Sequence, residues 1–109
     1  GKEQEEDFEL EEVNQNNVFF AQLGEDSRKQ ALNLIDKLRQ EGLFVDHNLG
    51  KKSLRDQLEL ADEQGAEYSL ILGQKETKNG EVIIRDMDSG DQRTVAQKNV
   101  VEEVRELVD

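Results

Sequence analysis

The chain has 109 residues, contains no cysteine and carries a formal net charge of −12. A chain of this length forms one domain, and the lack of cysteine excludes disulfides, zinc–thiolate sites and thiol nucleophiles. No apolar run approaches the roughly 20 residues of a membrane span, so we expect a cytoplasmic protein with no membrane partner.

The N-terminal residues are more acidic than the rest of the chain. Residues 1–12 hold seven acidic residues and one lysine, a net charge of −6. We expect residues 1–17 to be an acidic tail or interdomain linker and residues 18–109 to be the folded domain. The chain after residue 12 also has a net charge of −6, from 13 basic and 19 acidic residues. A polyanion would therefore need a local cluster of basic residues.

The first half of the domain predicts strands that alternate with helices. Apolar runs predict the strands, and apolar residues at helical spacing predict the helices. Ser27 and Gln30 form a capping-box pattern for the first helix, and Ser53 is the expected cap of the second. Strands that alternate with helices in this way pair in parallel. The predicted strands are 18–23, 43–47 and 68–72, and the predicted helices are 25–42 and 53–65.

The pattern changes after Gly73. Asn79-Gly80 predicts a turn into a strand over 82–86, and Ser89-Gly90 predicts a turn into another over 92–96. Asn99 is the expected cap of a last helix over 100–108. The predicted order is β-α-β-α-β-β-β-α. We therefore expect an α/β fold: one domain with a mixed five-stranded sheet flanked by three helices.

Few residues could carry catalysis. His47 is the only histidine, and no sequence motif supplies a nucleophile with its base or a phosphate-binding loop. We therefore expect this chain to have no enzymatic activity of its own, no cofactor and no bound metal.

Two loops collect residues that could bind a ligand. Loops at the carboxyl ends of neighbouring parallel strands lie side by side, so the loops after the second and third strands should be neighbours. Arg85 is the expected third contributor, with Lys78 and Arg93 at the rim. A set of solvated lysines would explain the same pattern. The candidate residues in the two loops are Lys51, Lys52, Arg55, Gln74, Lys75 and Glu76.

Three ordered segments carry a family resemblance: LRQEG, GKKSLRDQLELADEQGAEYSLILGQKE and NGEVIIRDMDSGDQRTVAQ. Over residues 18–108 the chain resembles the C-terminal anticodon-binding domain of class IIa aminoacyl-tRNA synthetases, most closely that of histidyl-tRNA synthetase. The resemblance implies the same mixed-sheet fold and a tRNA partner. It also implies a separate catalytic domain that uses ATP and Mg²⁺, in a parent enzyme that is typically a homodimer.

The resemblance also implies roles for individual residues. Glu76 and Arg85 match positions that contact anticodon bases in the family, and Lys51, with Lys52 beside it, matches a third contact. For histidine tRNA the expected anticodon is GUG. We expect Glu76 and Arg85 to face each other across the Asn79-Gly80 hairpin and to meet one base between them. A carboxylate can accept from a base's amino group, and a guanidinium can bond bidentately to guanine.

Two further expectations qualify this interpretation. Phe19, Phe20 and Phe44 are predicted to lie in the core, which leaves no aromatic platform for stacked bases. The alternative function is a synthetase-like protein-interaction or regulatory module that does not charge tRNA.

Overall fold

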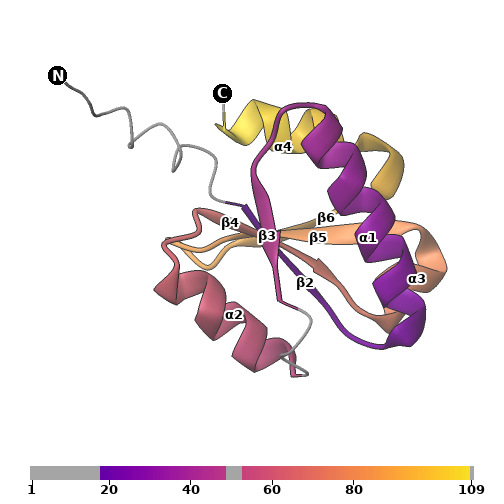
Figure 1. The fold of residues 1–109 in the computed structure, drawn as a ribbon, viewed down its shortest axis with the longest axis horizontal. Coiled ribbons are helices and arrows are strands. Elements are labelled where there is room, and N and C mark those ends of the chain that lie inside the picture. Colours follow the sequence, from indigo (N-terminus) through magenta and orange to yellow (C-terminus); the bar gives the residue numbers. More distant parts are fainter. Residues whose placement is uncertain (1–17, 49–52, 109) are drawn as a thin grey trace, which may run out of the picture.

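The computed structural model describes residues 18–48 and 53–108, which form a five-stranded sheet flanked by helices (Figure 1). The predicted tail over residues 1–17 lies outside the described residues. The elements in chain order are β2 (Val18–Gln22), α1 (Glu25–Gln40), β3 (Val45–His47), α2 (Leu54–Glu63), β4 (Tyr68–Leu72), α3 (Gln74–Asn79), β5 (Glu81–Asp86), β6 (Gln92–Ala96), the 3₁₀ helix η2 (Gln97–Asn99) and α4 (Val100–Val108).

The sheet is mixed, as the sequence predicts. Its strand order is β3-β2-β4-β5-β6, with β2 parallel to both of its neighbours. β5 is antiparallel to β4, and β6 is antiparallel to β5. The parallel part comes from the first half of the domain and the antiparallel part from the second half.

Side chains of successive strand residues enter two different cores, because they point to opposite faces of the sheet. On one face, Phe20 and Leu70 pack with the buried residues of α1 and α4. On the other face, Phe19 and Ile71 pack with Ala61 of α2. Figure 1 shows α2 on the opposite side of the sheet from α1 and α4. No helix in the described ranges is long and apolar enough to cross a membrane.

Helix α3 is absent from the predicted order. It lies directly after β4, where the sequence predicts a hairpin turn. Gly80, in the left-handed region with φ of 68°, is the residue that ends this helix, and its N–H donates to the carbonyl of Glu76. The Asn79-Gly80 signal therefore marks a helix C-terminus.

Two other local predictions were wrong. Helix α1 begins at Glu25 and its N-cap residue is Gly24, so Ser27 lies inside the helix and is not its cap. Phe44, which precedes β3, is 56% exposed and does not belong to the core. Ser53 does cap α2, as predicted: its hydroxyl accepts from the Asp56 N–H at 3.0 Å.

Candidate nucleic-acid interface

The three parallel strands end at one edge of the sheet, where the predicted binding loops begin. Gln57 of α2 joins this helix to the end of β2: its Oε1 accepts from the Gln22 N–H at 2.9 Å, and its Nε2 donates to the Gln22 carbonyl at 2.8 Å. On the other side of β2, Gln74 of α3 lies beside Gly24. The structure thus brings the starts of α2 and α3 to the same edge. The strands that lead into them, β3 and β4, are not neighbours, contrary to the prediction, because β2 lies between them.

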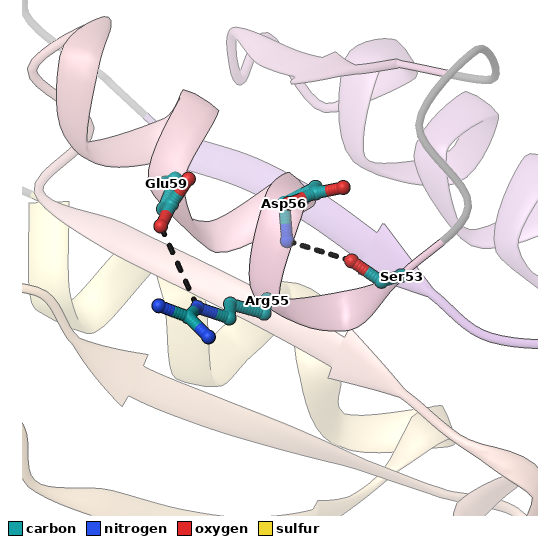
Figure 2. Close-up of polar contacts among 4 residues, drawn as sticks. All are labelled: Ser53, Arg55, Asp56 and Glu59. Atoms are coloured by element: carbon teal, nitrogen blue, oxygen red, sulfur yellow. Dashed lines mark hydrogen bonds and ion pairs between the residues drawn. The ribbon is translucent and has the colours of Figure 1, made fainter.

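The start of α2 contributes one exposed guanidinium to this edge. Figure 2 shows Arg55 in the first turn of α2, next to Ser53 and pointing toward Glu59. The Arg55 side chain is 87% exposed, and its Nε lies 3.6 Å from Glu59 Oε2. An ion pair this exposed contributes little to stability, so Glu59 holds Arg55 only weakly. Lys51 and Lys52, predicted to act beside Arg55, lie outside the described residues.

The start of α3 contributes a fixed carboxylate. Gln74 and Lys75 are exposed, whereas Glu76 is half-buried. Glu76 Oε1 accepts from the Gly73 N–H at 3.0 Å. This bond satisfies a backbone donor that the helix itself leaves free, so it holds the Glu76 side chain against the end of β4.

Arg85 lies away from the edge where β4 ends and α3 begins. It pairs with Ser69 of β4 and Gln92 of β6, and Ser69 is three residues before the end of β4, about 10 Å along the strand. Arg85 Nη1 donates to Gln92 Oε1 at 2.9 Å, and Nη2 lies near Gly90, in the turn between β5 and β6. The guanidinium therefore points away from the end of β4.

The predicted Glu76–Arg85 arrangement was accordingly wrong. The two residues do not face each other across a hairpin, because α3 separates β4 from β5 and the cross-strand neighbour of Arg85 is Ser69. They lie at different places on the surface.

The two predicted rim residues also lie apart. Lys78 is exposed near the end of α3. Arg93 points to the other face of the sheet, where its Nη2 lies 2.7 Å from Glu103 Oε1 of α4. The prediction that places Arg93 at the rim of this interface was wrong.

The sheet face that carries Arg85 is open over β5 and β6. Ile83 and Arg85 are half-buried on this face, and their partners on β6, Thr94 and Gln92, are exposed. We call these four residues the open sheet face. Sequence reasoning missed Gln92 and Thr94, although their alternation with Arg93 and Val95 on a strand is a signal that could have identified them.

His47 adds no charge to this edge at neutral pH. It ends β3, and burial together with the Arg39 guanidinium lowers the pKa of His47 below its usual 6.5, against a raising effect of Asp46. The imidazole is therefore mainly neutral at pH 7. Any positive charge here comes from lysine and arginine.

Comparison with known proteins indicates what this surface belongs to. The chain is similar to the histidine–tRNA ligase of Aquifex aeolicus, with 40% identity over 85 residues, which are 78% of this chain and 21% of that protein. The histidine–tRNA ligase of Staphylococcus carnosus is 32% identical over 98 residues, which are 90% of this chain and 23% of that protein. The chain therefore spans less than a quarter of the length of these two relatives.

A solved structure and a family model agree with these relatives. The crystal structure of histidyl-tRNA synthetase from Nostoc superposes with a TM-score of 0.79 and 29% identity over 85% of this chain and 22% of that chain. The family model described as the anticodon binding domain matches residues 13–107. By this match, the chain belongs to the anticodon-binding-domain family, and it is of the kind found in histidyl-tRNA synthetases.

Proposed function

We propose that this domain binds the anticodon loop of histidine tRNA as one part of a histidine–tRNA ligase. The observation that carries the proposal is the family match over residues 13–107. The names of the two relatives supply the amino-acid specificity. The anticodon expected for this tRNA is GUG.

The surface suits an unpaired RNA loop. Bases of an unpaired loop expose their edges, which side chains can read by hydrogen bonds. The Arg85 guanidinium can donate two bonds to a guanine edge, and the Glu76 carboxylate can accept from an amino or imino group. Because these residues lie at different places, we propose that they contact different nucleotides of the loop. Phosphate contacts would come from the basic residues at the edge, Lys51, Lys52, Arg55 and Lys75.

Catalysis would belong to a domain outside this chain. That domain would bind ATP and Mg²⁺ and charge the tRNA, while this domain positions the anticodon. The parent enzyme would be a homodimer. Contacts from its other parts would add to an affinity that the negative charge of this chain keeps low.

Titration of the 109-residue chain with an anticodon stem-loop tests the proposal. We expect saturable binding of a GUG stem-loop at low salt, and at least about tenfold weaker binding of a stem-loop that differs only in its anticodon, since one well-made base contact contributes about 1–3 kcal/mol of discrimination. Log affinity should fall linearly with log salt concentration.

Two outcomes would contradict the proposal. Equal affinity for the two stem-loops would show that the domain does not read the anticodon. No binding of either stem-loop at low salt, by a chain shown to be folded by circular dichroism, would favour the protein-interaction module.

A further inference from the structure

A pair of hydroxyl groups joins α1 to α3 beneath the candidate interface. The oxygens Ser27 Oγ and Thr77 Oγ1 lie 2.6 Å apart. Ser27 is fully buried in the first turn of α1, and Thr77 is half-buried in α3. Burial of a hydroxyl is costly unless it is bonded, so this contact helps to fix how the two helices meet. A longer bond, from Gln30 Nε2 of α1 to the Thr77 carbonyl at 3.4 Å, joins the same helices.

The hydroxyl protons have a defined direction. Thr77 Oγ1 donates to the Gly73 carbonyl at 2.8 Å. A hydroxyl has one proton and two acceptor lone pairs, so the proton between the two oxygens must come from Ser27. The result is a chain from Ser27 to Thr77 to Gly73, in which each bond polarises the next.

Gly73 is therefore held through both of its backbone groups. Its carbonyl accepts from the hydroxyl and, at 2.9 Å, from the N–H of Thr77. Its own N–H donates to the carboxylate of Glu76. Thr77 and Glu76, adjacent in sequence, thus share Gly73 as their anchor.

Polar contacts, and not an apolar core, hold α3 in place. None of its six residues is buried. A helix this short is not stable by itself. At its far end, Gln97 donates its N–H to the Gly80 carbonyl at 2.9 Å, and its Nε2 donates to Gln30 Oε1 of α1, also at 2.9 Å. The position of α3 consequently depends on a few hydrogen bonds.

From this geometry we propose that Ser27 and Thr77 are positioning residues for Glu76, and that base discrimination depends on their hydroxyl pair. The inference rests on the proposed function, because Glu76 can discriminate bases only if this surface binds the anticodon. Neither hydroxyl needs to touch RNA. Loss of the pair leaves the charges unchanged but frees α3 to shift, which moves the carboxylate relative to the base.

The test uses the 109-residue chain and the two stem-loops described above. Thr77→Val keeps the shape of the side chain and removes its hydroxyl. We expect it to lower the ratio of the two affinities about tenfold, the loss of one base contact, and to leave the salt dependence unchanged. Ser27→Ala, which removes only the interhelical bond, should lower the ratio by less. Thr77→Ser, which keeps the hydroxyl, should restore most of it.

A double-mutant cycle separates positioning from a general loss of structure. Glu76→Gln keeps an oxygen for the Gly73 N–H but removes the carboxylate charge. If Thr77 acts through Glu76, then Thr77→Val should lower the ratio no further in the Glu76→Gln background. Val104→Ala, in the buried face of α4, is the control: it should lower the melting temperature without changing the ratio.

The outcomes distinguish this inference from the function on which it rests. If the unmodified chain does not discriminate between the stem-loops, the proposed function fails and the inference with it. If the unmodified chain discriminates and a folded Thr77→Val variant discriminates equally well, only the positioning role is overturned. If Thr77→Val lowers the ratio of the two affinities as much in the Glu76→Gln background as in the unmodified chain, Thr77 does not act through Glu76.

Discussion

Arg85 presents a planar guanidinium from the open sheet face, oriented by its bond to Gln92 Oε1. This orientation leaves a guanidinium fork of the kind that reads a guanine edge, whereas a lysine at the same place would offer only a point charge. The identity of the cation at position 85, and not just its charge, should therefore matter.

Arg85→Lys should reduce the preference for the GUG stem-loop by about 1–3 kcal/mol and leave the salt dependence of binding unchanged. Fluorescence anisotropy titrations at several salt concentrations measure both quantities. Arg93→Lys is the matched control, because Arg93 pairs with Glu103 on the opposite face of the sheet. A preference that survives Arg85→Lys, or that Arg93→Lys also reduces, would exclude the open sheet face as the base-reading surface.

At the scale of elements, the edge of the sheet depends on how α2 is attached to β2. The amide of Gln57 bonds both backbone groups of Gln22, in the way that a neighbouring strand would, and Gln57 is only 2% exposed. A leucine of similar size would leave the N–H and carbonyl of the half-buried Gln22 without these partners.

Gln57→Leu should therefore lower the free energy of unfolding by about 1–3 kcal/mol, measured by urea denaturation followed by circular dichroism. Gln64→Leu makes the same change at the exposed C-cap of the same helix, and should stay within about 0.5 kcal/mol of the unmodified chain. Equal stability of the two variants would show that the amide contributes nothing beyond its volume.

The elements that were predictable from the sequence are those that bury an apolar face. The periodic apolar residues of α1, α2 and the strands predict the mixed five-stranded sheet. Helix α3 has no such face, since its residues are all polar and none is buried. Its N-terminal bond, from the Gly73 N–H to Glu76, is a local cap, and its bond to Ser27 is a tertiary contact. Neither produces an apolar period, so periodicity could not reveal this helix.

The candidate site was predictable to a similar degree. Parallel strand direction correctly predicts that β3 and β4 end at one edge of the sheet, but the two strands are not neighbours as expected, because β2 lies between them. The predicted position of Arg85 opposite Glu76 was wrong because residues 74–79 form helix α3 and not one side of a hairpin. Arg85 is therefore paired with Ser69 of β4. The misplaced core residue, Phe44, precedes an edge strand of only three residues, and an apolar residue there need not be covered.

For the whole molecule, the net charge of −12 opposes the approach of any RNA, and half of it lies in residues 1–12. Repulsion of this kind acts over the Debye length, about 10 Å at 0.1 M salt and about 3 Å at 1 M. It slows association and weakens binding without any specific contact. The acidic N-terminal residues should therefore weaken RNA binding at low salt in a way that does not depend on the anticodon.

Deletion of residues 1–12 should raise the affinity for both stem-loops about threefold at low salt and leave their ratio unchanged, with the difference lost near 1 M salt. The matched control keeps the length and replaces all seven acidic residues of this segment by their amides; it should reproduce the deletion. If the amide variant instead binds like the unmodified chain while the deletion binds more tightly, the segment acts by covering the surface and not by its charge. A change in the ratio of the two affinities would show that the segment contacts the base-reading residues themselves.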